Sequence, residues 1–130
     1  MIPEIPRALA GRYCPVIAFS EIAKGKYKLN VLFWLSKGPM RFGELRKILA
    51  INCMGKETAP RLVSRELKHL EKLGLITRKQ FAVIPPKVEY SVTPLGLTIV
   101  PIVERIVKWG IDGHHEAILG LRRPKMRARR

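Results

Sequence analysis

The sequence is poor in the residues that hold metals, form disulfides or build active sites. Its 130 residues include two cysteines, three histidines and ten acidic side chains. The cysteines, Cys14 and Cys53, do not make a disulfide framework, and no Cys or His pair has the spacing of zinc ligands. No Ser-His-Asp order, paired-carboxylate spacing or phosphate-binding glycine loop stands out. The sequence therefore predicts no metal, no cofactor and no enzymatic activity.

Long hydrophobic runs are missing as well. No stretch approaches the roughly 20 apolar residues of a membrane-spanning helix. Prolines interrupt the first segment before any long apolar run, which does not fit a signal peptide. We therefore expect a cytoplasmic protein that makes no use of a membrane.

What the chain has in excess is positive charge. There are 25 Lys and Arg against 10 Asp and Glu, a formal net charge of +15, and 47% of the residues are hydrophobic. This size and hydrophobic content fit one domain with arms. An excess of this size must be neutralised by a negatively charged partner, and the candidates are nucleic acid, an anionic membrane surface or an acidic protein.

Hydrophobic periodicity predicts several short helices before residue 60. Residues 1–13 are proline-rich and read as an arm, with a short helix around Arg7 to Arg12 as the alternative. Val16 to Ala23 follows Pro15, which suits a first helical turn. Tyr27 to Leu35 is apolar nearly all round, as in a buried central helix. Phe42 to Leu49 forms a two-turn amphipathic helix.

A longer helix is predicted after a loop over residues 50–57. Thr58 is its expected N-cap, and Gly74 is the expected stop. One face carries Leu62, Val63, Leu67, Leu70 and Leu73. The opposite face carries four cations without an acid among them, with Ser64 at its edge; such cations repel one another unless a polyanion covers them, although an ordinary solvated face is the alternative. These cations are Arg61, Arg65, Lys68 and Lys72.

A β-hairpin is predicted next. Residues 75–80 and 87–92 have strand character, and Pro85-Pro86 forces the turn between them. Arg78, Lys79 and Lys87 give the hairpin a basic rim. Helix, short helix, longer helix and hairpin is the order of a winged helix-turn-helix. The expected fold is mainly α with a small β-hairpin, a winged domain over residues 14–93.

The segment over residues 94–120 is expected to be helical, capped by Thr93 and kinked at Pro101. It is too apolar for the surface of a monomer, so it predicts dimerisation helices. Folding back onto its own domain would explain only one of its faces. Residues 121–130 form a basic tail that we expect to be disordered.

Taken together, these segments resemble the HxlR-type transcriptional regulators, a branch of the MarR-like winged-helix group. The resemblance spans Tyr13 to Gly110 in the order of the family. The segments that carry it are Tyr13-Cys14-Pro15-Val16, Lys24-Gly25-Lys26-Tyr27-Lys28-Leu29, Gly38-Pro39-Met40-Arg41-Phe42-Gly43-Glu44-Leu45-Arg46, Leu67 to Ile76, Val83 to Thr93, and Trp109-Gly110.

The resemblance implies a homodimer joined by terminal helices. It also implies that the cysteine that precedes a proline near the N-terminus, Cys14 here, acts as a thiol switch in some members; the alternative is a partly buried apolar cysteine without a signalling role. The chain departs from the family between Leu49 and Pro60, where it is longer and lacks the usual Pro-Gly-Ile-Ser turn. Arg61 is the best match to the lysine that begins the family's recognition helix.

The predicted function is that of a sequence-specific, homodimeric DNA-binding regulator whose effector is unknown. The longer helix would enter the major groove of double-stranded DNA. One alternative is an architectural protein that binds DNA without sequence preference, and another is a protein-interaction module. The candidate DNA-binding residues are Arg41, Arg46, Arg61, Ser64, Arg65, Lys68, Arg78, Lys79 and Lys87.

Overall fold

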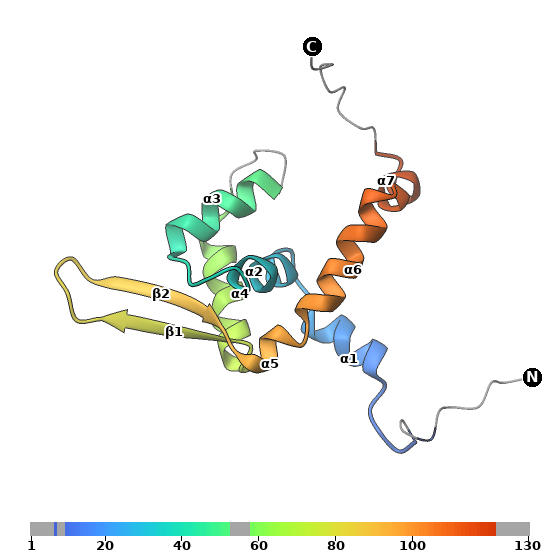
Figure 1. The fold of residues 1–130 in the computed structure, drawn as a ribbon, viewed down its shortest axis with the longest axis horizontal. Coiled ribbons are helices and arrows are strands. Elements are labelled where there is room, and N and C mark those ends of the chain that lie inside the picture. Colours follow the sequence, from blue (N-terminus) through green and yellow to red (C-terminus); the bar gives the residue numbers. More distant parts are fainter. Residues whose placement is uncertain (1–6, 8–9, 53–57, 122–130) are drawn as a thin grey trace, which may run out of the picture.

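The computed structural model describes residues 7, 10–52 and 58–121. The predicted architecture, mainly helical with one antiparallel hairpin, is confirmed (Figure 1). In chain order the elements are α1 (Pro15–Ile22), α2 (Lys28–Leu35), α3 (Phe42–Asn52), α4 (Pro60–Lys72), β1 (Ile76–Phe81), β2 (Lys87–Val92), α5 (Pro94–Leu97), α6 (Val100–Ile111) and α7 (His114–Leu119).

The core is built around α2, as its apolar sequence predicted. Val31, Leu32 and Leu35 of this helix are fully or almost fully buried. Helices α3, α4 and α6 and strand β2 all contact α2. A short helix surrounded on so many sides must be apolar over most of its circumference.

The connection between α3 and α4 differs from the prediction. Helix α3 continues to Asn52, so the expected loop over residues 50–57 begins too early. Thr58 is not the N-cap of α4: Ala59 takes that position, and Thr58 is buried with its hydroxyl accepting a hydrogen bond from Arg46. The Thr58 hydroxyl thus bonds to Arg46, and α4 has no side-chain hydrogen bond at its N-cap. The rest of the loop, including Cys53, lies outside the described residues.

The hairpin has the predicted strands in a regular antiparallel register. Its pairs run from Ile76 with Val92 to Phe81 with Lys87. The segment before α3 joins its edge, because Met40 and Tyr90 exchange two backbone hydrogen bonds of 3.0 and 2.8 Å. The hairpin is thus tied to the start of α3 as well as to the end of α4.

The helical segment after β2 is interrupted rather than kinked at Pro101. Thr93 is its N-cap as predicted, with Oγ1 accepting a hydrogen bond of 3.1 Å from the Gly96 amide. Helix α5 ends at Leu97, and α6 begins so that Pro101 lies in its first turn. A proline inside a helix clashes with the carbonyl four residues earlier, here Leu97, whereas in the first turn it is tolerated.

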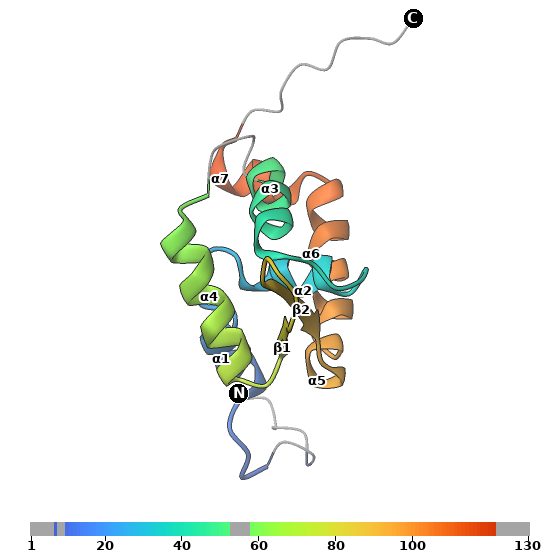
Figure 2. The ribbon, with the colours of Figure 1, turned by 90° about the vertical axis from the view of Figure 1, so that its left-hand side faces the viewer.

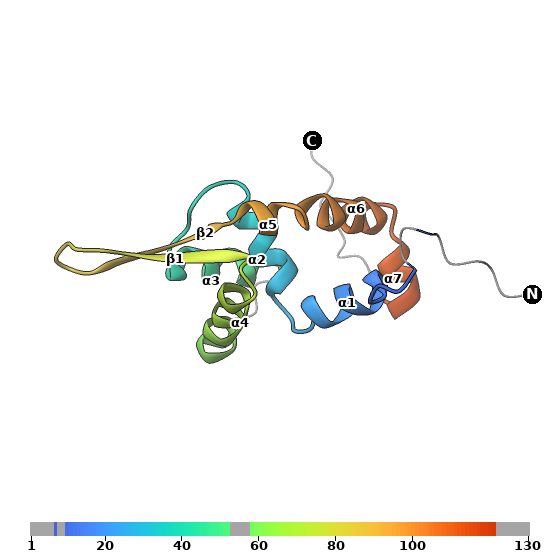
Figure 3. The ribbon, with the colours of Figure 1, turned by 90° about the horizontal axis from the view of Figure 1, so that it is seen from below.

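The elements are distributed toward two ends of the molecule. The hairpin projects at one end, and α1, α6 and α7 lie at the other, with α2, α3 and α4 between them (Figures 1 and 3). Seen along the hairpin, α4 lies on one side of it and α6 on the other (Figure 2). Most of the predicted arm and nearly all of the predicted tail lie outside the described residues.

Candidate nucleic-acid interface

Helix α4 has two faces of opposite character. Val63, Leu67 and Leu70 are buried in the core. The four predicted cations of the opposite side are all exposed, and we call them the cationic face. The helix begins at Pro60 and ends before Gly74, whose φ of +77° suits a residue without a side chain. Burial of the apolar side therefore presents the cationic face to solvent. It comprises Arg61, Arg65, Lys68 and Lys72.

Four predicted DNA-binding residues line one shallow depression on this helix. Pro60 and Phe42 form its apolar part. Phe42 begins α3, so both helices of the predicted motif border the depression. The guanidinium and ammonium groups around it can contact phosphates or base edges. The four residues are Arg61, Ser64, Arg65 and Lys68.

A second depression joins α4 to the hairpin. Ser64 and Lys68 of α4 line it together with Arg78 of β1 and Tyr90 of β2. Arg78 and Tyr90 are directly opposite each other in the register. The predicted hairpin cation Arg78 therefore lies on the same surface as the cationic face.

The other two hairpin cations lie on the opposite face, so the predicted single basic rim is wrong in this detail. Successive strand residues point to opposite faces, which separates Lys79 from Arg78. The Nζ atoms of Lys79 and Lys87 lie 4.9 and 5.1 Å from the ring centroid of Phe81. Lys87 also forms a 3.0 Å ion pair with Glu89. The ammonium groups of Lys79 and Lys87 therefore lie near Phe81, on the face of the hairpin that is opposite Arg78.

The two candidates on α3 and its approach have different surroundings. Arg41 is exposed, and its backbone amide donates to the Glu44 carboxylate at 3.0 Å, which caps the start of the helix. Arg46 is half-buried. Its guanidinium donates to the hydroxyl and the carbonyl oxygen of Thr58, at 3.4 and 3.2 Å. Arg46 therefore links α3 to the residues that precede α4.

The four cations of the cationic face form no ion pair with the described residues, although Glu71 lines the depression that contains Lys68 and Arg78. In the described part of the chain, the ion pairs are Lys28–Glu66 and Lys87–Glu89. None of the four cations of α4 takes part in them. The positive potential of this side of the molecule therefore remains available to an anionic partner.

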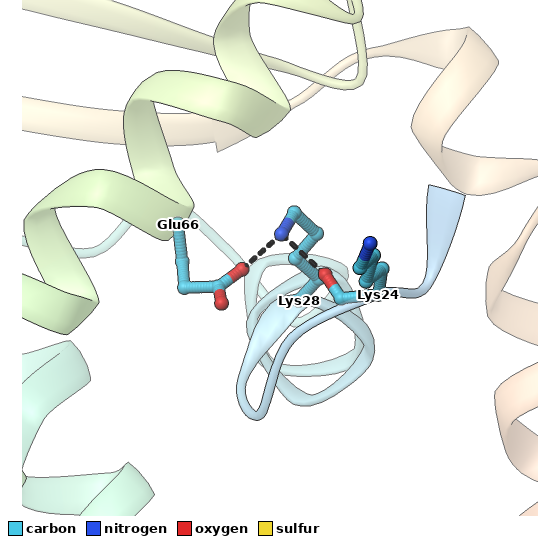
Figure 4. Close-up of polar contacts among 3 residues, drawn as sticks. All are labelled: Lys24, Lys28 and Glu66. Carbon is cyan, nitrogen blue, oxygen red and sulfur yellow. Dashed lines mark hydrogen bonds and ion pairs between the residues drawn. The ribbon is translucent and has the colours of Figure 1, made fainter. Parts of the chain in front are cut away.

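Sequence reasoning missed a buried polar contact behind this helix. Glu66 lies on the inner side of α4, and its carboxylate pairs with the Lys28 ammonium of α2 (Figure 4). Lys28 also donates to the Lys24 carbonyl oxygen at 2.5 Å. The available signal was the position of Glu66 between Val63 and Leu67, on the apolar side of the helix.

A second surface, at the end opposite the hairpin, carries many exposed apolar side chains among charged ones. Helix α6 buries Val100 and Val103 against the core, but its other sides remain exposed. We call this surface the apolar end face. Its exposed side chains are Val16 and Ile17 of α1, Ile102, Ile106, Val107, Trp109 and Ile111 of α6, and Ile118 and Leu119 of α7.

The part of the chain that the structure describes contains no group of three His, Cys, Asp or Glu side chains that could hold a metal ion. Within that part, no helix combines the length and apolar character that crossing a bilayer requires.

A basic helix exposed beside a hairpin, with a preceding helix packed behind it, is the arrangement of a winged helix-turn-helix domain. A family model described as HxlR-like helix-turn-helix matches residues 22–117. The chain therefore belongs to the HxlR-like helix-turn-helix family, which confirms the resemblance seen in its sequence.

Relatives and solved structures agree with this assignment. YkvN of Bacillus subtilis, an uncharacterized HTH-type transcriptional regulator, is 36% identical over 97 residues, 75% of this chain and 77% of YkvN. A protein assigned to the MarR family, from Porphyromonas gingivalis W83, superposes with a TM-score of 0.70 at 34% identity, over 84% of this chain and 97% of that one. The redox regulator HypR in its oxidised form has a TM-score of 0.67 at 34% identity, over 76% and 96%.

Proposed function

We propose that this chain is a homodimeric regulator that recognises a specific DNA sequence through α4. The observation that carries the proposal is the depression in which Arg61, Ser64, Arg65 and Lys68 meet on one exposed side of that helix. Arginine can pair bidentately with guanine in the major groove, whereas lysine mainly supplies charge to phosphates. Arg78 would extend the contact from the hairpin to the backbone or minor groove.

The dimer is proposed from the apolar end face. Exposed apolar side chains on three helices form a surface of the kind that monomeric proteins seldom leave uncovered. Because this face lies opposite the hairpin, pairing two copies through it leaves both α4 helices exposed (Figure 3). Two-fold symmetry then predicts a near-palindromic site with half-sites about 34 Å apart.

The dimer is tested by its mass in solution. Ile102→Glu and Ile106→Glu place charge in the apolar end face and should convert the dimer to a monomer in sedimentation equilibrium. Ile84→Glu is the matched control, since Ile84 is fully exposed in the hairpin connection, away from that face. Native chain that sediments as a monomer at micromolar concentration would remove the dimer from the proposal.

The DNA-binding proposal is tested by selecting bound DNA from a random pool and footprinting the enriched sequence. We expect a discrete protected site, and Arg61→Ala/Arg65→Ala should weaken binding by about a hundredfold for each half-site, because each subunit loses two base contacts of roughly 1.4 kcal/mol. Lys26→Ala/Lys37→Ala removes the same charge from exposed residues outside α4, the hairpin and the apolar end face, and should have little effect.

The same experiment separates the two alternatives. Uniform protection without an enriched sequence would support an architectural DNA-binding protein, which the net charge of +15 favours. Unchanged DNA affinity in Arg61→Ala/Arg65→Ala at moderate salt would support a protein-interaction module.

We further propose that Cys14 makes the regulator responsive to oxidants. Cys14 is a free, exposed thiol at the N-cap of α1, a helix of the apolar end face. The likeness to HypR, a redox regulator, supports this role. Oxidation there would alter the surface through which two copies meet. Operator affinity should change on treatment with a disulfide-forming oxidant in the native chain and stay constant in Cys14→Ser; an identical response in both removes Cys14 from the mechanism.

A further inference from the structure

A buried ion pair connects the recognition helix to the helix behind it. The side chains of Lys28 and Glu66 are 7% and 5% exposed, and their charged groups are in direct contact (Figure 4). The Lys28 ammonium has a second partner in the Lys24 carbonyl oxygen. The contact therefore brings together α4, the first turn of α2 and the turn that precedes α2.

The turn between α1 and α2 is shaped around the same carboxylate. Gly25 has a φ of +115°, a conformation that side-chain-bearing residues rarely adopt. A Cβ atom at this position would lie 2.1 Å from Oε1 and 2.7 Å from Oε2 of Glu66. The Glu66 carboxylate thus occupies space that only a glycine leaves free, and the turn cannot move toward α4 without displacing it.

Stability alone is a weak explanation for such a pair. Removing two charges from water costs free energy that their attraction often fails to recover, and apolar replacements of similar volume are frequently as stable. An ion pair instead restricts the relative orientation of the two helices, because the carboxylate and the ammonium must stay within a short distance of each other. The aliphatic contacts of Val63, Leu67 and Leu70 tolerate small shifts between packed helices more readily.

Glu66 directly follows Arg65 and lies two residues from Ser64. A rotation of α4 that moved the Glu66 carboxylate would turn both of these outward-facing residues with it. Contact residues must be held within about 0.5 Å of their productive positions to bind well. The inner ion pair and the outer DNA contacts are therefore mechanically linked through one rigid helix.

We propose that the Lys28–Glu66 pair is a positioning contact that sets the orientation of α4 on DNA and joins it to the α1–α2 turn. The proposal rests on the proposed DNA-binding function. Lys28 and Glu66 are positioning residues, because neither lies on the surface that meets the nucleic acid. Through Lys24 and Gly25, a displacement of α1 would reach the recognition helix.

The central variant is Lys28→Met/Glu66→Leu, which leaves the net charge and the cationic face unchanged. Its free energy of unfolding in urea should equal or exceed that of the native chain. Its affinity for the selected operator should fall by about tenfold for each half-site, the loss of one well-placed base contact per subunit, while its affinity for random DNA stays constant. Native operator affinity in this variant overturns the proposal, as does an affinity loss matched by loss of folded protein.

A second variant, Glu66→Asp, keeps the pair charged but shortens one arm by a methylene group, so that α4 must move to maintain contact. It should also lose operator affinity severalfold without losing affinity for random DNA. If the double variant does not fold, native operator affinity in Glu66→Asp still overturns the proposal.

A measurement without DNA separates this proposal from the proposed function. Spin labels at Ser20→Cys on α1 and Lys72→Cys on α4, in a Cys14→Ser/Cys53→Ser background, report the distance between the two helices. Labelled chains are diluted with unlabelled chains so that only distances within one protomer are seen. The native pair should give a narrow distribution and Lys28→Met/Glu66→Leu a broader or shifted one. If the distance distribution is the same in both proteins, the pair does not position α4, even where the native chain has a discrete operator. If the native chain has no operator but the distribution changes, the proposed function fails while the effect of the pair on the orientation of α4 stands.

Discussion

Arg78 and Lys79, adjacent in β1, lie on opposite faces of the hairpin. Arg78 is paired with Tyr90 and lines a depression with Ser64 and Lys68 of α4. Lys79 is paired with Glu89 and has its ammonium over the ring of Phe81. Two neighbouring cations of the same strand therefore have unequal access to anything that contacts α4.

We expect Arg78→Ala to weaken operator binding more than Lys79→Ala, although each variant removes one positive charge. Loss of a contact beside α4 should cost about tenfold in affinity for each half-site, whereas loss of a charge on the far face should act only through the overall field. Fluorescence anisotropy with the selected operator at fixed salt compares the two. Equal losses would show that the hairpin approaches DNA through both faces.

The salt dependence of binding should report the phosphate contacts of the cationic face. Each neutralised phosphate contributes about −0.9 to the slope of log affinity against log salt concentration. Lys68→Ala should therefore reduce that slope by about one for each subunit of the bound protein. Lys37→Ala, which removes an exposed charge outside α4 and the apolar end face, is the matched control and should leave the slope as it is.

Arg46 should contribute to stability. Its guanidinium donates two hydrogen bonds to Thr58, which is buried, and these bonds hold the approach to α4 against α3. Arg46→Ala should lower the free energy of unfolding by about 1–2 kcal/mol, since it leaves buried acceptors without a partner. Urea denaturation measures the change, and Lys47→Ala, at the exposed neighbouring residue, should leave the midpoint in place.

Thr93 should stabilise the junction between the hairpin and the last helices. Its hydroxyl accepts from the Gly96 amide and donates to the Gly74 carbonyl oxygen at 2.7 Å, so it joins α5 to the end of α4. Thr93→Ala should cost about 1 kcal/mol, as for the loss of other N-caps. Thr98→Ala removes an exposed hydroxyl bonded only to the preceding turn, and thermal unfolding should show a smaller effect.

The elements that follow a regular repeat were predictable from the sequence. The two faces of α4 follow from the helical period of its apolar and basic residues, and the hairpin follows from strand patterns on either side of Pro85-Pro86. The buried character of α2 followed in the same way. In each case the pattern of residues close together in the sequence determines the type of element and which of its sides is buried.

The contacts that sequence reasoning missed depend on residues distant in the chain. Arg46 appeared as a free cation because Thr58, its partner, is twelve residues away. Glu66 was given no role by the sequence because Lys28, its partner, belongs to another helix. The sequence shows that Glu66 lies among apolar residues of α4, but its partner Lys28 is identified only by the packing of α2 against α4.

The separation of α4 into a buried and an exposed side has a consequence for how such proteins diversify. Arg61 and Arg65 are exposed and Ser64 is at most half-buried, so substitutions there leave the packing of Val63, Leu67 and Leu70 intact. A duplicated gene can thus acquire a new target sequence through a few codons of one helix, while the hydrophobic interior is inherited unchanged. Under the positioning role proposed for the pair, a change at Lys28 or Glu66 would alter the preference of the copy that carries it whatever residues stand on its outer face, because it would tilt the whole reading surface.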